Sequence, residues 1–184
     1  MTRRPRGYVG KNHETIGSDI LALVKSLKLP QLTLGKDIAD RLVNVSPTGW
    51  YPIAWLLEAM ETLEAKLGAS ALRQMGQILF RMSHADRVAP PSAKAVIHGI
   101  DAMYHHANRG DDIGGWKVLR FAPGYAELEK NTPHHCVMEE GILNAALTAA
   151  GVNAAISQSQ CFRKGGDVCV YKIEVARVDA RWGT

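Results

Sequence analysis

The chain has 184 residues, of which 46% are hydrophobic, and it carries a formal net charge of +4. This length suits a single globular domain, and no apolar run approaches the roughly 20 residues that a membrane-spanning helix requires. The basic N-terminal residues lack an aromatic platform and no apolar segment follows them, which argues against direct nucleic-acid binding and against a secretory signal. We therefore expect a cytoplasmic protein, whose cysteines favour metal binding or reactive chemistry over disulfides.

Helices are predicted over the first part of the chain, after a basic flexible tail at residues 1–16. Residues 17–184 are expected to form one domain. Apolar side chains recur there at intervals of three and four residues, which is the spacing of amphipathic helices, although residues 31–49 show no clear period. Helices are predicted from Ser18 or Asp19 to Lys28, over 52–67 with Gly68 at its end, over 70–82, and over 90–108.

From Trp116 onward the apolar pattern changes to every second residue, which predicts strands. Two strands are expected over 116–122 and 125–130, joined by a turn at Pro123-Gly124, and a helix ends near Ala150. Two further strands are expected near 153–163 and 167–178. This order, N-terminal helices followed by β-β-α-β-β, predicts an α+β fold in which helices pack on one antiparallel sheet.

All three cysteines lie in the last third of the chain, at Cys136, Cys161 and Cys169. Gly165 and Gly166 suit a tight hairpin turn, so Cys161 and Cys169 are expected to face each other across two strands. Together with Cys136 and the neighbouring His135 they provide the ligand types of a structural zinc site. Three inert buried thiols, or a disulfide between Cys161 and Cys169, are the alternatives.

The segments 131–143 and 161–173, with a cysteine before a helix and a hairpin carrying two more, resemble the 4-vinyl reductase domain. Related domains are the haem–nitric-oxide-binding (H-NOX) domains, the sensor domains of phenol-responsive activators and the TRAPP subunits. The resemblance implies a homodimeric domain that encloses a small apolar molecule between helices and sheet. It also implies zinc on the three cysteines; a carboxylate ligand of the phenol sensors is replaced here by Gln158, so His135, His134, Glu139 or water would complete the site.

The same resemblance implies the ligand contacts. Trp116 and His84 correspond to the tryptophan and histidine with which the phenol sensors bind their ligand. A haem ligand of the H-NOX type would be His98, His105 or His106, although the Tyr-x-Ser-x-Arg motif of those domains is missing. Each of these side chains has a plainer interpretation, as part of the core or as the polar end of a helix.

We therefore expect a stand-alone sensor domain that binds a hydrophobic, for example aromatic, small molecule through Trp116 and one of His84, His98 and His105. Catalysis is not expected and no catalytic residue is assigned, because no nicotinamide or flavin motif is present. The alternatives are a haem-based gas sensor, a tetrapyrrole 4-vinyl reductase or its accessory protein, and an assembly subunit.

Overall fold

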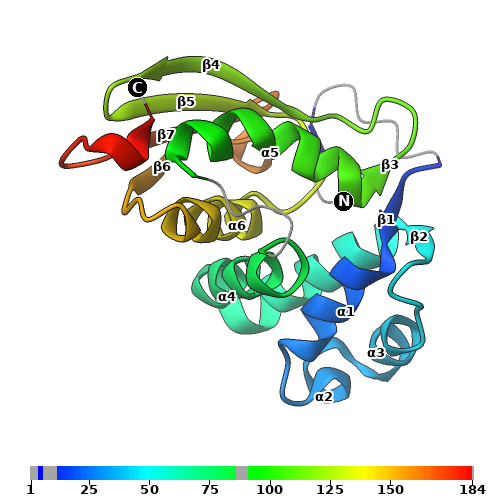
Figure 1. Ribbon diagram of the computed structural model, residues 1–184. Coiled ribbons are helices and arrows are strands. Elements are labelled where there is room, and N and C mark those ends of the chain that lie inside the picture. The colour runs from blue at the N-terminus through cyan, green and yellow to red at the C-terminus, as the bar shows by residue number, and fades with distance from the viewer. Residues whose placement is uncertain (1–3, 6–11, 86–90, 184) are drawn as a thin grey trace.

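Helices precede the main sheet along the chain, which confirms the predicted α+β class. The structure is a computed structural model that describes residues 4–5, 12–85 and 91–183. One group of helices packs together at one end of the molecule, whereas the next helix lies along the main sheet (Figure 1). The first group is α1 (Gly17–Lys25), α2 (Pro30–Leu34), α3 (Lys36–Val43) and α4 (Ile53–Ser83), and the helix along the sheet is α5 (Ala93–Ala107).

The main sheet has the strand order β4-β5-β7-β6, with all neighbours antiparallel. A helix connects the two hairpins, as the predicted β-β-α-β-β order requires. Gly124 adopts a φ of 74° between the first two strands, a conformation that glycine reaches without strain. The elements are β4 (Trp116–Ala122), β5 (Tyr125–Lys130), α6 (Cys136–Ala149), β6 (Ala155–Gln160) and β7 (Cys169–Glu174).

A second, small sheet has the order β2-β1-β3 and was not predicted. Its strands are β1 (Glu14–Ile16), β2 (Trp50–Pro52) and β3 (Asn108–Arg109), which are too short to show a period of two in the sequence. β1 lies inside the segment predicted to be a flexible tail. Arg4, also in that segment, forms an ion pair with Glu61 at 2.8 Å, whereas Arg3, Arg6 and Lys11 lie outside the described residues.

Helix α4 is interrupted at Gly68, which has φ 80° and ψ 173°. Only glycine adopts such a conformation readily, so the helix changes direction there. The two predicted helices over 52–67 and 70–82 therefore correspond to the two halves of α4. Residues 31–49, which showed no clear period, contain the short helices α2 and α3.

The second half of α4 packs closely against α6. A Cβ atom on Gly76 would lie 2.0 Å from the carbonyl oxygen of Met138, and one on Gly141 would lie 2.1 Å from the carbonyl oxygen of Arg73. Each glycine therefore allows the backbone of the other helix to approach. This contact fixes the position of α6, and with it the loop that carries His134, His135 and Cys136.

The hairpin between β6 and β7 has a different loop from the one predicted. β6 ends at Gln160, and a 3-10 turn over Phe162–Lys164 follows before Gly165, whose φ is 110°. Cys169 pairs with Lys130 on β5, and the partner of Val170 on β6 is Gln160. Cys161 and Cys169 therefore lie at the next position of this register and their sulfur atoms are within 4.8 Å, as expected, but Cys161 lies beyond the end of its strand and is not part of the ladder.

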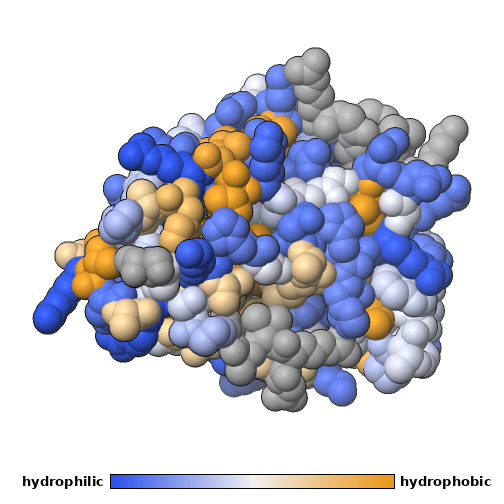
Figure 2. All heavy atoms as spheres, turned by 45° about the horizontal axis from the view of Figure 1, so that its top comes forward, coloured by the Kyte–Doolittle hydropathy of each residue, from blue (hydrophilic) through white to orange (hydrophobic). Residues whose placement is uncertain are grey.

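The surface in Figure 2 is mainly hydrophilic, with apolar side chains interspersed. Among the described residues, no helix combines the length and the apolar character needed to cross a membrane. The large apolar side chains that are exposed include Leu29, Leu32, Val43, Leu67, Met82, Leu119 and Val178.

Candidate functional site

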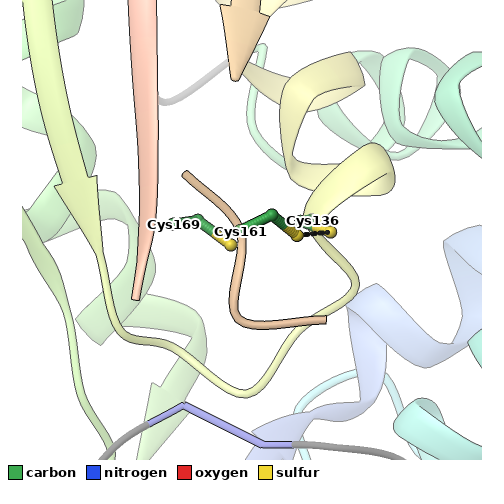
Figure 3. Close-up of side chains that lie close together, drawn as sticks. All are labelled: Cys136, Cys161 and Cys169. Carbon is green, nitrogen blue, oxygen red and sulfur yellow. Dashed lines mark hydrogen bonds between the residues drawn. The ribbon is translucent and has the colours of Figure 1, made fainter. Parts of the chain in front are cut away.

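Three elements bring the cysteines together. Cys136 is the first residue of α6, Cys161 follows the last residue of β6, and Cys169 is the first residue of β7. Their sulfur atoms all lie within 4.8 Å of one another, and the Sγ atoms of Cys136 and Cys161 are 3.3 Å apart (Figure 3). All three side chains are buried. The group can supply three sulfur ligands to one metal ion.

The three thiols are not equivalent. A hydrogen bond from Cys169 lowers the pKa of Cys136 to about 5, against the effect of burial, and the nearby ammonium of Lys130 acts in the same direction. That hydrogen bond and burial raise the pKa of Cys169, and burial raises the pKa of Cys161. Cys136 is therefore the thiolate of the group, and a bound metal ion would also deprotonate the other two.

His135, the predicted fourth zinc ligand, lies outside the sulfur group. Its Nδ1 accepts the backbone N–H of Val137 at 3.3 Å, which caps α6, and its Nε2 lies 2.9 Å from Oε2 of Glu64. The same carboxylate oxygen binds Arg163. Burial lowers the pKa of His135 in spite of the hydrogen bond to Glu64. Within the described residues, only the three cysteines form a metal-ligand cluster.

A cavity of about 30 Å³ lies between the N-terminal helices and the main sheet. Its walls come from α1, α5, α6, the start of β4 and the residue that follows α4. A second cavity, of about 20 Å³, shares the lining residues Asp19, His134, Glu139 and Ile142 and is otherwise apolar. The first cavity is lined by Asp19, His84, Met103, Tyr104, Ala107, Asn108, Trp116, His134, Glu139 and Ile142.

Charged and polar side chains line the first cavity although nearly all are buried. His134 Nδ1 lies 3.0 Å from Oε1 of Glu139, and His84 Nε2 lies 3.4 Å from Oδ2 of Asp19. Within the described residues, three buried atoms of the lining side chains have no hydrogen-bond partner: Asp19 Oδ1, Asn108 Oδ1 and His134 Nε2. Such atoms cost free energy unless a bound molecule satisfies them, which makes this cavity the candidate binding site.

Lys130 connects the cavity to the cysteines. Its side chain is fully buried, and its Nζ donates to the carbonyl oxygen of His134 at 2.7 Å. Burial alone would raise the pKa of Glu139, but the hydrogen bond from His134 and the charge of Lys130 hold it below its ordinary value. The same ammonium lowers the pKa of Cys136, so one buried cation stabilises an anion on each side.

The structure separates the predicted ligand-binding residues into two groups. Trp116 and His84 line the first cavity, and the Trp116 ring packs against Tyr171 at 5.4 Å between centroids. His98 and His105 lie on the exposed side of α5 and are not among the lining residues. His98 contacts Phe121, and Nδ1 of His105 donates a hydrogen bond to the carbonyl oxygen of Asp101.

The sequence prediction missed Asp19 and Asn108 and gave Glu139 only a minor role. Two of these positions carried a signal. Asp19 lies four residues before Leu23, and Glu139 lies four before Leu143, so each carboxylate shares a helix face with a buried leucine. A carboxylate on an apolar face indicates a buried charge. Asn108 follows directly on α5 and has no comparable signal.

Comparison with solved structures shows that this chain has the fold of H-NOX domains. An H-NOX protein from S. oneidensis in the Fe(II) state aligns with a TM-score of 0.68 at 16% identity, covering 90% of this chain and 98% of that chain. An H-NOX protein from S. oneidensis in the Fe(II)NO state aligns with a TM-score of 0.67 at 18% identity, covering 88% of this chain and 99% of that chain. The unliganded Fe(II) H-NOX protein from K. algicida aligns with a TM-score of 0.62 at 12% identity, covering 89% of this chain and 98% of that chain.

The sequence matches no protein-family model and no curated protein. The predicted relationship to H-NOX domains is thus confirmed at the level of the fold. The resemblance to the 4-vinyl reductase domain stays a prediction.

The fold raises the question of whether this chain has room for a haem. Pockets for ligands of drug size measure about 300–1,000 Å³, whereas the cavity between the helices and the sheet measures about 30 Å³. The three candidate histidines on α5, His98, His105 and His106, are exposed. The residues and the space present in this arrangement do not fit a haem.

Proposed function

We propose that this chain is a small-molecule sensor domain that uses the H-NOX fold to hold its ligand in the cavity between the N-terminal helices and the sheet. The observation that carries the proposal is that one cavity is lined by three side chains, each with a buried polar atom that has no partner among the described residues. Trp116 and His84 contribute to the same wall. Because α1, α5, α6 and the residue that follows α4 all line this cavity, occupancy would favour one arrangement of these helices over another.

A cavity-filling substitution tests this proposal. Ala107 is buried on α5 and lines the cavity, so Ala107→Leu should fill it and abolish ligand binding. Ala102→Leu, at an exposed position of the same helix, is the matched control. Native mass spectrometry of each purified protein would show a retained small molecule on the wild type and on Ala102→Leu. An unchanged ligand signal in Ala107→Leu would remove the cavity from the proposal.

The H-NOX fold favours a second candidate, a haem-based gas sensor, which the small volume of the cavity opposes. Titration of the purified protein with hemin decides between the two. A Soret band that Ala107→Leu abolishes would establish haem binding between the helices and the sheet. The cavity volume leads us to expect no specific haem absorbance and no change in melting temperature.

We also propose that Cys136, Cys161 and Cys169 hold a structural zinc ion. The support is the grouping of three buried sulfur atoms from three elements, which a metal ion would tie together. The fourth ligand would be water or a small anion, since His135 is engaged by Glu64. Elemental mass spectrometry should find one zinc per chain, and a Cys169→Ser variant should lose it; absence of zinc from the wild type would favour inert thiols.

The predicted homodimer and cytoplasmic location go with this sensor role as further proposals. A ligand-binding domain needs a partner surface through which a ligand-dependent change can be read. The native mass spectrum that reports the ligand also reports the number of chains. A dimer whose population changes with ligand would support the proposal, whereas a monomer under all conditions would contradict it.

A further inference from the structure

We infer that the cavity between the N-terminal helices and the sheet binds a primary ammonium group, the charged end of a short alkylamine. This inference rests on the proposed function, because it assigns a ligand class to the same cavity. It starts from three lining side chains, Asp19, Asn108 and His134, which are only 5%, 3% and 6% exposed. Each has one polar atom without a partner among the described residues.

Two of the three atoms are oxygen acceptors. Oδ2 of Asp19 lies 3.4 Å from Nε2 of His84, which leaves Oδ1 facing no protein donor within the described part of the chain. The amide nitrogen of Asn108 donates to the carbonyl oxygen of Tyr104 at 3.0 Å. This hydrogen bond fixes the orientation of the amide, so the unpartnered atom of Asn108 is its oxygen.

The third atom is a nitrogen that also accepts. Nδ1 of His134 lies 3.0 Å from the carboxylate of Glu139, and a carboxylate can only accept a hydrogen bond. Nδ1 therefore carries the hydrogen of this bond, and in the corresponding tautomer of the ring Nε2 offers a lone pair. A carboxylate behind an imidazole holds the ring in one tautomer and one orientation.

The chemistry of the ligand follows from counting donors. A primary ammonium has three N–H donors and no acceptor, which matches three acceptors around one cavity. A water molecule has two donors, a hydroxyl group has one, and a quaternary ammonium has none. The carboxylate of Asp19 also supplies negative charge, and hydrogen bonds between charged groups are stronger than those between neutral ones.

The neighbouring cavity limits the rest of the ligand. It shares Asp19, His134, Glu139 and Ile142 with the first cavity and is otherwise lined by apolar side chains from α4 and α6. Its volume of about 20 Å³ leaves room for a tail of one or two carbons. The ligand class is therefore a small alkylamine, and its apolar end would lie against Leu56, Met60, Leu79 and Met138.

Two probes with the same number of heavy atoms, and a larger quaternary ammonium without donors, separate this inference from its alternatives. Isothermal titration calorimetry of the wild type with ethylammonium chloride, ethanol and tetramethylammonium chloride, at constant ionic strength, compares three donors, one donor and none. We expect ethylammonium to bind at least about tenfold more tightly than ethanol, and tetramethylammonium not to bind. A long-range proton–nitrogen spectrum should show His134 Nε2 shifting with ethylammonium only.

Substitution of Asp19 provides the second arm. Asp19→Asn keeps the shape of the side chain and should weaken ethylammonium binding at least about tenfold. Asp112→Asn, at an exposed loop position whose φ of 52° asparagine tolerates, removes the same charge and should leave binding unchanged. If Asp19→Asn does not fold, the three probes on the wild type still decide.

The outcomes separate this inference from the proposed function. Equal affinity for ethylammonium and ethanol, binding of tetramethylammonium, or an unaffected Asp19→Asn variant would overturn the ammonium assignment and leave the sensor proposal standing. Failure of every probe, together with a purified protein that retains no small molecule, would overturn both.

Discussion

The buried pair of His134 and Glu139 stands between the cavity and Lys130. Glu139→Gln keeps the volume but removes the charge that faces the Lys130 ammonium, and we expect a loss of about 2 kcal/mol in the free energy of unfolding. Glu140→Gln is the matched control. Its partner Arg73 is 41% exposed, so this substitution should change stability by less than about 1 kcal/mol. Urea denaturation of the two variants measures both effects, and equal losses would contradict the buried pair's importance.

His135 should make the stability depend on pH. Burial lowers the pKa of His135 in the folded state below its ordinary value of 6.5, whereas the unfolded chain keeps that value. Below pH 6.5 the unfolded state therefore binds more protons than the folded state. The contribution of His135 to the free energy of unfolding is fully present above pH 6.5. It is lost as the pH falls, at no more than about 1.4 kcal/mol per pH unit.

Melting temperatures between pH 7.5 and 5.5 measure this dependence. His135→Asn keeps an acceptor that can cap α6 and cannot titrate, so its melting temperature should fall less steeply on acidification. His105→Asn, at an exposed position, should keep the slope of the wild type. Equal slopes of melting temperature against pH for the wild type and His135→Asn would show that His135 does not contribute to the pH dependence of stability.

At the scale of the elements, the contact between α4 and α6 depends on two glycines. Gly141→Ala would place a Cβ 2.1 Å from the carbonyl oxygen of Arg73, so the helices must separate. Such overpacking costs about 1–3 kcal/mol. Gly99→Ala, within α5, has no atom within 4 Å of the added Cβ and should stabilise by about 0.5–1 kcal/mol. Denaturation midpoints of Gly141→Ala and Gly99→Ala that shift in the same direction would contradict this account.

The elements also show what the sequence could and could not predict. The strands β4 and β5 and the two halves of α4 follow from apolar spacing and from Gly68 and Gly124, because local sequence determines each. The strands β1, β2 and β3 are two or three residues long and pair with residues far away in the chain, so no local pattern marks them. Cys161 left its predicted strand because a turn with the buried Phe162 at its start follows β6.

For the candidate site, sequence spacing brought Cys136, Cys161 and Cys169 into one hypothesis, and their sulfur atoms do converge. The position of His135 was not predictable, because its partner Glu64 lies on α4. The first cavity depends on side chains from three helices, two strands and the segments that hold His84 and His134, and only the fold brings them together. Of the predicted ligand contacts, Trp116 and His84 lie there.

At the scale of the whole molecule, the cysteines join the sheet to α6. If zinc occupies them, its removal should loosen the β6–β7 hairpin and the start of α6 together. We expect a chelator to lower the melting temperature of the wild type. The Cys169→Ser variant should have this lower melting temperature both with and without the chelator. Ser159→Ala, at an exposed position of β6 with no metal ligand, should respond like the wild type. A chelator effect that persists in Cys169→Ser would contradict the assignment.

The two adjoining cavities depend on the backbone conformation of Gly68, which lines neither of them. Leu56 and Met60 line them from the first half of α4, whereas Leu79 and His84 line them from its far end. In an unbroken helix Leu56 and His84 would be roughly 42 Å apart, at about 1.5 Å per residue. The reversal at Gly68, where an added Cβ would meet no atom within 4 Å, folds the two ends toward a common space. A residue outside the lining of both cavities thereby governs whether the proposed binding site forms.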